Sequence, residues 1–148
     1  MATLFAFLHH VSAFTLVAAF AVEFVLLRGE LTLSSARKLQ VADIVVAVSA
    51  TILLAVGLMR VFFFEKGAAY YFQSHAFLGK ISLFILVALI SAIPTIEFIS
   101  WGKPIKAGQV PAVTSKKLRA LRSIIHVELA GVVLILLFAA IMAKGGWN

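Results

Sequence analysis

Four apolar segments, each long enough to cross a lipid bilayer, constrain the fold of this chain more than any other feature. They cover residues 4–27, 41–64, 77–99 and 124–143. About 20 predominantly apolar residues suffice for a helix to cross the hydrocarbon core. Because backbone polar groups have no water partners in lipid, spans of this length must be helical. The sequence therefore predicts an all-α integral membrane four-helix bundle, a single domain over residues 1–148 whose first partner is the lipid bilayer.

Composition excludes several classes of protein. The chain is 63% hydrophobic and 13% charged, whereas soluble domains have roughly 45–50% apolar and about 25% charged residues. The absence of cysteine rules out a disulfide framework, a zinc ribbon and thiol catalysis. The net charge of +7 lies in loops beside apolar segments, which indicates membrane topology and anionic lipid, not nucleic acid. No phosphate-binding loop or soluble-enzyme motif is present.

The first apolar segment has a second interpretation, as a cleaved signal peptide, because small residues occur within residues 18–22. Signal peptides begin with a basic region, however, and their apolar run is only ~7–15 residues long. Neither property fits residues 4–27. We therefore expect this segment to be a helix of the mature protein.

Charge in the connecting segments predicts the orientation. The connection after the first span carries three Lys or Arg and residues 103–122 carry six, whereas the opposite side has only Lys66 and Lys144. The positive-inside rule places the basic loops in the cytoplasm. Both termini then face the outer, periplasmic side of a bacterial inner membrane. We call the end that carries the termini the outer end, and the end with the basic loops the inner end.

Local signals refine the helices. Ser34 or Ser35 is expected to be the N-cap of a short lead-in to the second span. Pro94 is expected to kink the third span, because proline removes a backbone hydrogen bond and crowds the preceding turn. Tyr70 and Tyr71 lie where an interfacial aromatic belt is expected.

Polar residues gather near the outer end. A charge inside a span costs at least ~2.5–3.5 kcal/mol and usually marks a site. Given the predicted orientation, the residues at outer depth are His9, His10, Arg60, Glu65, Lys66, His75 and Lys80. Imidazoles combined with cations suit an anionic cofactor that needs a nitrogen ligand, and haem b is one such cofactor.

Each member of this outer group also has a purely structural interpretation. The pair His9–His10 could be interfacial, and His75 could be solvated at the mouth of a loop. Arg60 could extend to the surface or pair with Glu65. Lys80 lies about one turn inside its span and needs a partner or water.

A second polar group lies at inner depth, where acidic and basic side chains occur together. His126 lies there too, roughly 20 Å from the depth of His9 at ~1.5 Å per residue, so the two cannot bind one iron. A structural ion-pair layer is the favoured interpretation and a proton route the alternative. The residues concerned are Glu23, Arg28, Asp43, Glu97, Arg122 and Glu128.

Three short motifs occur together: an LH pair early in the first span, LGKISLFILVALI in the third, and a glutamate early in the fourth. This combination resembles the protoporphyrinogen oxidase (HemJ-type) and copper-resistance protein D group of four-helix membrane proteins, and still more a sister family of predicted bacterial membrane proteins with no assigned function. The resemblance implies functional roles for His9, Lys80 and Glu128, with b-type haem. The chain departs from that group in having LHHVSAF instead of a tryptophan-bearing motif, and IIHVELAG instead of an NEVP-like start.

The leading hypothesis is a b-type haem protein of the inner membrane with an electron-transfer or oxidoreductase role at its outer face, acting with a quinol, a porphyrin or a redox protein. His9 is the expected iron ligand with His75 or His10 as the second, and Arg60 and Lys80 serve propionates or substrate. Copper or small-solute transport is an alternative, although Cys is absent and Met occurs only three times. A cofactor-free structural or assembly subunit is the other alternative, and a homodimer is compatible with any of these.

Overall fold

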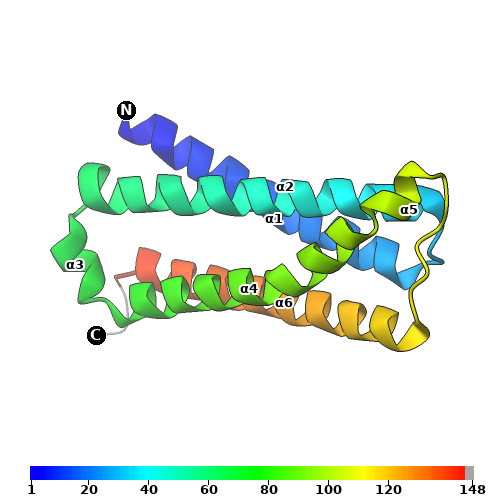
Figure 1. Ribbon diagram of the computed structural model, residues 1–148. Coiled ribbons are helices and arrows are strands. Elements are labelled where there is room, and N and C mark those ends of the chain that lie inside the picture. The colour runs from blue at the N-terminus through cyan, green and yellow to red at the C-terminus, as the bar shows by residue number, and fades with distance from the viewer. Residues whose placement is uncertain (146–148) are drawn as a thin grey trace.

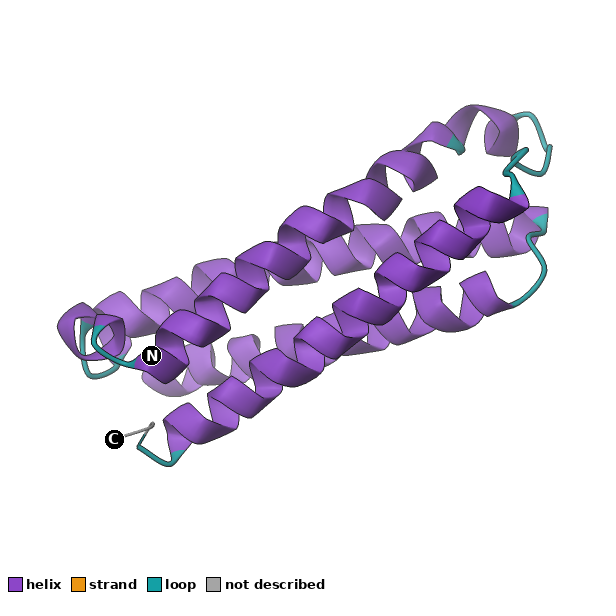
Figure 2. Cartoon of the chain, turned by 90° about the horizontal axis from the view of Figure 1, so that it is seen from below, coloured by secondary structure: helices purple, strands orange, loops and turns teal. Residues whose placement is uncertain are grey.

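The computed structural model describes residues 1–145 as a bundle of four long helices that run up and down (Figures 1 and 2). All four are long and apolar enough to cross a membrane, which confirms the predicted all-α fold. The long helices are α1 (Ala2–Arg28), α2 (Leu33–Met59), α4 (His75–Ser100) and α6 (Ser115–Ala143). Three short elements join them: the π-helical turn η1 (Arg60–Phe64), α3 (Ala68–Phe72) and α5 (Gly102–Lys106).

Two helices begin well before the apolar segments that predicted them. The N-cap of α2 is Thr32, whose hydroxyl accepts from the Ser35 backbone N–H at 3.1 Å while Ser35 Oγ accepts from the Thr32 backbone N–H at 2.8 Å. The prediction of Ser34 or Ser35 as the cap was therefore wrong, since Ser35 is the reciprocal partner in a capping box. Similarly, Thr114 caps α6. Hydropathy finds only the lipid-embedded part of a helix, so it misses these basic first turns.

The long helices form two closely packed pairs. α1 packs along α2 and α4 along α6, whereas α2 and α4 contact each other much less. Two glycines allow the second pair to approach: a Cβ at Gly79 would lie 2.7 Å from the Phe138 ring, and one at Gly131 would lie 2.5 Å from Val87 Cγ2. Small residues at such crossings let membrane helices gain van der Waals contact. The loose α2–α4 contact leaves room for cavities between the pairs.

The cluster of buried apolar side chains is larger at the inner end than at the outer end. The inner core contains eight buried side chains, including Leu39, Phe98, Trp101 and Ile125. At the outer end the corresponding cluster contains only Val61, Tyr71 and Phe77, with Met142 against it. The outer end is therefore where the bundle has space for a ligand.

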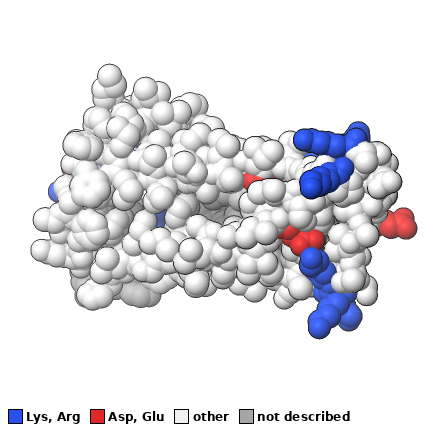
Figure 3. Space-filling view, in the orientation of Figure 1, with Lys and Arg blue, Asp and Glu red and all other residues white. Residues whose placement is uncertain are grey.

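The arrangement of the ends agrees with the predicted topology. The start of α1 and the end of α6 lie at the same end of the bundle as α3 (Figure 1). Lysine and arginine side chains gather at the opposite end, over α5 and the start of α6 (Figure 3). As predicted, α4 bends in its second half, which contains Pro94 (Figure 1).

Candidate ligand-binding site

A cavity of about 400 Å³ lies at the outer end, within the ≈ 300–1,000 Å³ range of small-molecule sites. Side chains from α1, α2, η1, α3, α4 and α6 line it, and most are apolar, such as Phe77, Phe84 and Met142. Four of the five predicted site residues line the cavity, together with two further polar residues, Glu65 and Tyr71. The four are His9, His10, Arg60 and Lys80.

His9 is a half-buried residue of α1 that lines the cavity against α2. Its ring lies so close to Gly57 that a Cβ there would be 3.2 Å from His9 Cε1 and 3.4 Å from Nδ1. The carbonyl of Leu53 is also a neighbour of the ring. Nevertheless, within residues 1–145 the buried Nδ1 atom makes no hydrogen bond. Nδ1 thus faces the backbone of α2, and with its proton directed at the Leu53 carbonyl the neutral ring keeps Nε2 as the acceptor for a ligand.

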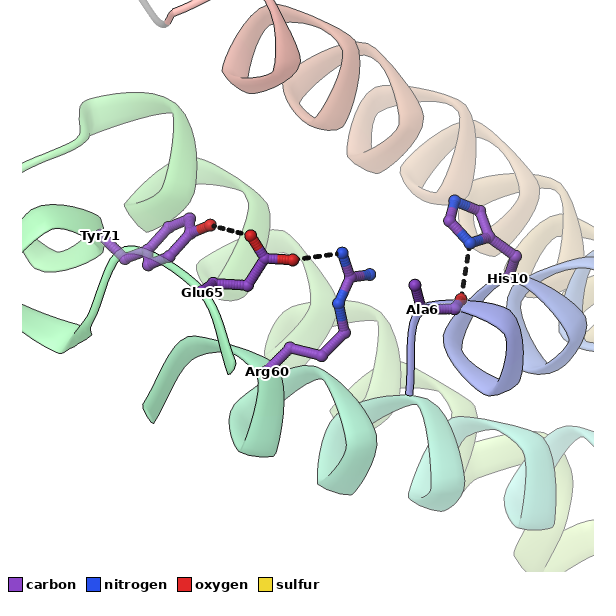
Figure 4. A network of polar contacts seen from close by, with 5 residues as sticks. All are labelled: Ala6, His10, Arg60, Glu65 and Tyr71. Atoms are coloured by element: carbon purple, nitrogen blue, oxygen red, sulfur yellow. Dashed lines mark hydrogen bonds and ion pairs between the residues drawn. The ribbon is translucent and has the colours of Figure 1, made fainter. Parts of the chain in front are cut away.

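His10 lies at the edge of the cavity and is exposed. Its ring is perpendicular to that of His9, with the centroids 6.2 Å apart. His10 Nδ1 donates to the Ala6 carbonyl at 2.6 Å (Figure 4). In a neutral ring this assignment leaves Nε2 as an acceptor, the state in which histidine binds a metal.

Arg60, Glu65 and Tyr71 form a hydrogen-bonded chain beside the cavity (Figure 4). Arg60 Nη2 lies 2.7 Å from Glu65 Oε1, and the Tyr71 hydroxyl donates to Glu65 Oε2 at 3.4 Å. Burial and the Glu65 carboxylate raise the pKa of Tyr71 above its ordinary value, so this hydroxyl stays protonated and can donate. Of the two structural interpretations of Arg60, the structure shows the pair with Glu65. Arg60 begins the π-helical turn η1, a distortion frequent at functional sites.

Lys80 is half-buried on α4 and lines the same cavity. Within the described chain it forms no hydrogen bond or ion pair. Arg60 and His9 are close enough to Lys80 for their charges to interact unfavourably. An excess of cations in an apolar cavity favours an anionic ligand, since the anion would relieve this repulsion.

His75, the remaining predicted site residue, is the first residue of α4 and is exposed. It is not among the residues that line the cavity. The structure therefore brings His9, His10, Arg60 and Lys80 together and leaves His75 outside.

Two residues of the site were missed by the sequence analysis. Tyr71 was interpreted only as part of an aromatic belt, and nothing in the YYF run distinguishes the inward ring from the outward one. Gly57 was overlooked, although a single glycine within an apolar helix often marks a close approach. Its contact with His9 joins helices 48 residues apart in the chain, so no local pattern shows it.

The inner polar group differs from the predicted ion-pair layer. Glu97 does pair with Lys117 at 2.8 Å and accepts from Trp101 Nε1 at 3.0 Å. Arg122, however, donates to the backbone carbonyls of Leu27 and Gly29. The last carbonyls of a helix lack partners and carry partial negative charge, so they attract this guanidinium.

The other inner carboxyls lack cations. Arg28 lies over the Phe24 ring, 5.2 Å from its centroid. Within residues 1–145, no ion pair is formed by Glu23, Asp43 or Glu128. The predicted pairing of these three was therefore wrong, because both arginines are engaged nearer the inner surface.

No group of three or more His, Cys, Asp or Glu in the described part of the chain could hold a metal ion. A bare metal ion would therefore find too few ligands here. A metal that brings most of its own ligands, as haem iron does, needs only one or two side chains.

Comparison with known proteins identifies the family. No match was found among curated proteins or among solved structures. The family described as "Predicted membrane protein (DUF2214)" matches residues 1–146. This agrees with the expected resemblance to a family of predicted membrane proteins, while the likeness to protoporphyrinogen oxidases and copper-resistance protein D stays a prediction. The chain therefore belongs to the predicted membrane protein family DUF2214 over almost its whole length.

Proposed function

We propose that the chain binds haem b in its outer cavity, as an inner-membrane protein with an electron-transfer or oxidoreductase role at that face. The observation that carries this proposal is the half-buried imidazole of His9 in the lining of a cavity that also contains two cations, Arg60 and Lys80. Bundles commonly hold cofactors between facing helices.

The residues present fit haem in three respects. His9 offers an imidazole nitrogen, the usual protein ligand of b-type haem iron. Arg60 and Lys80 offer cations for the two propionates, and the Arg60 Nε atom is buried without a hydrogen-bond partner in the described chain. Phe77, Phe84 and Met142 offer apolar walls for the macrocycle.

Haem is favoured over free copper by the number of available ligands. Porphyrin nitrogens supply four ligands of the iron, so one or two side chains complete its coordination. Copper(I) prefers thiolate or thioether ligands, and the chain has no Cys. Of its three methionines, only Met142 lines the cavity.

Bound haem would supply one-electron chemistry, and the protein would supply its orientation and electrostatics. His9 would hold the iron, with the Gly57 contact fixing the position of the ring. Arg60 would pair with a propionate in competition with Glu65, to which Tyr71 donates. His10 is favoured over His75 as a second ligand, because it lines the cavity and its Nδ1 is fixed by Ala6.

The test is an absorption spectrum of the detergent-purified protein, before and after reduction with dithionite. We expect a Soret band that shifts on reduction, with sharp α and β bands if two side chains ligate the iron. His9→Ala should abolish the bands. The matched control is His126→Ala, at the inner end beside the Phe24 ring, which should retain them.

The opposite result has a defined meaning. A featureless spectrum after expression with added haem would overturn the proposal and favour a transport or structural role. Retention of haem by His9→Ala but not by His126→Ala would show that the cofactor lies at the inner end. His10→Ala and His75→Ala, compared by their spectra, would identify the second ligand.

A further inference from the structure

Three buried carboxyl groups lie near one another in the membrane-spanning part of the bundle. Glu23 is on α1, Asp43 on α2 and Glu128 on α6, and their exposed fractions are 1%, 6% and 0%. Asp43 and Glu128 are near enough to Glu23 for their charges to interact with it. We call Glu23, Asp43 and Glu128 the carboxyl cluster.

The nearby cations are engaged elsewhere. Lys117 pairs with Glu97, Arg122 donates to carbonyls at the end of α1, and Arg28 lies over the Phe24 ring. The titratable ring of His126, on α6, packs edge-on against the same Phe24 ring with the centroids 4.6 Å apart, and it forms no ion pair in the described chain. The two remaining intramembrane cations, Arg60 and Lys80, line the outer cavity. On α4, the fourth helix packed around the cluster, the charged groups are thus Glu97, already paired, and Lys80 near the other end.

Hydrogen bonding within the cluster is incomplete. Thr95 Oγ1 donates to Asp43 Oδ1 at 2.7 Å. In contrast, both carboxyl oxygens of Glu128 and Oε1 of Glu23 are buried without a hydrogen-bond partner in the described chain. The Ser91 hydroxyl is likewise buried and unpartnered, and it is a neighbour of Glu128.

These observations are incompatible with three ionised carboxylates. An unpaired carboxylate in a low-dielectric interior is strongly destabilising, and like charges nearby add to that cost. A protonated carboxyl is neutral and also gains an O–H donor. Glu128 could then donate to Ser91 or to a neighbouring carboxylate, so protonation removes the charge and satisfies the unpartnered atoms together.

A second cavity, of about 250 Å³, lies beside the cluster, although none of the three carboxyl residues lines it. Ser91 and Thr95, the neighbours of Glu128 and Asp43, both line it. This inner cavity shares Phe84 and Ile135 with the outer cavity. In Figure 3 acidic atoms are visible between α2 and α4, where the surface is hollowed.

We propose that Glu23, Asp43 and Glu128 form a proton-binding site inside the membrane, which exchanges protons through the hydroxyls of Ser91 and Thr95 along the inner cavity. The ligand is the proton and not a metal ion, because no three carboxylates in the described chain are arranged so that they could bind one metal ion. The site is separate from the outer cavity and does not depend on haem.

The test uses dicyclohexylcarbodiimide, an apolar reagent that reacts with protonated carboxyl groups, on the full-length protein in membranes. Adducts are located by mass spectrometry across a range of pH. We expect labelling of Glu128 or Glu23 at neutral pH that is lost as the pH is raised. Glu30, exposed in the α1–α2 connection, and Glu97, paired with Lys117, are internal controls that should remain unlabelled at neutral pH.

Infrared spectroscopy of the same protein gives a second readout. Glu128→Gln and Glu23→Gln should each remove part of the carbonyl band of protonated acids without loss of thermal stability, since glutamine is a neutral isostere. Glu97→Gln should leave that band unchanged. Ser91→Val and Thr95→Val should slow its shift when H₂O is exchanged for D₂O.

Two results would overturn the proposal. One is the absence of both the carbodiimide adducts and the protonated-acid band in the unaltered protein, which would mean that the carboxyls are ionised. The other is a band that persists in full in both glutamine variants, which would place the protonated acid elsewhere.

Discussion

The two ends of the bundle are built differently. Outside the carboxyl cluster, polar groups at the inner end have partners: Gln40 Nε2 donates to the Phe98 carbonyl at 2.6 Å, and Trp101 donates to Glu97. At the outer end, His9 and Lys80 line a cavity and form no hydrogen bond within the described chain. The inner core holds eight buried side chains and the outer cluster three.

The inner end is suited to stabilise the bundle, and the outer end is suited to bind a ligand. A densely packed inner end can hold the helices together while the outer end keeps polar groups unpaired and space open. Functional sites commonly carry such unfavourable features at the expense of local stability. We therefore expect substitutions at the inner end to change unfolding, and substitutions at the outer end to change ligand binding.

The largest expected effect is on stability, at the inner core. Phe98 is fully buried there, and truncating such a side chain removes contacts and leaves a cavity. Phe98→Ala should lower the free energy of unfolding by ~3–5 kcal/mol, measured by thermal or denaturant unfolding in detergent. Phe63→Ala is the control, because Phe63 is 74% exposed. An equal loss in both variants would mean that the inner core is not the stabilising region.

A smaller loss is expected where α4 and α6 cross. A Cβ at Gly79 would lie 2.7 Å from the Phe138 ring, too close without movement of the helices or the ring. Gly79→Ala should therefore destabilise the bundle by ~1–3 kcal/mol, although alanine favours helix. Gly102→Ala is a suitable control, since its Cβ would meet only Gln40 at 3.9 Å. No change in unfolding for Gly79→Ala would show that the pair is less closely packed than described.

The contrast between the ends also explains what could be predicted from the sequence. The four spans follow from apolar length alone, so the fold and the shared position of the termini were predicted correctly. His9, His10, Arg60 and Lys80 were grouped correctly because depth along a span follows from residue count. The residue count does not give the direction in which a side chain points around the helix axis, nor the contacts between helices.

The incorrect predictions concern residues whose exposure or partners depend on contacts between helices. His75 has the correct depth, yet it is exposed at the start of α4. Arg122 has the correct depth to pair with a carboxylate, yet it binds the carbonyls at the end of α1. Composition cannot distinguish a carboxylate from a free backbone carbonyl as the partner of an arginine.

Gly57, a residue that the sequence analysis missed, allows a test of the outer end. Alanine gains up to ~1 kcal/mol of helix propensity over glycine, while its Cβ would crowd His9 Cε1 at 3.2 Å. These effects oppose each other, so Gly57→Ala should leave unfolding nearly unchanged. It should weaken haem binding, measured by hemin titration, because the His9 ring must shift. Unchanged affinity would show that the position of His9 does not determine binding.

The smallest expected effect on stability is at the Arg60–Glu65 ion pair, whose side chains are 23% and 34% exposed. Exposed pairs contribute only ~0–1 kcal/mol, so Glu65→Gln should barely change unfolding. The same substitution frees the Arg60 guanidinium from the Glu65 carboxylate, which should raise hemin affinity at low salt. At high salt this gain in affinity should be smaller, because salt screens the attraction between Arg60 and a propionate. Glu30→Gln, an exposed glutamate without an ion pair in the described chain, controls for the change in net charge. Weaker binding by Glu65→Gln alone would mean that Glu65 works by holding Arg60 in position, so that a fixed guanidinium matters more at the outer end than a free one.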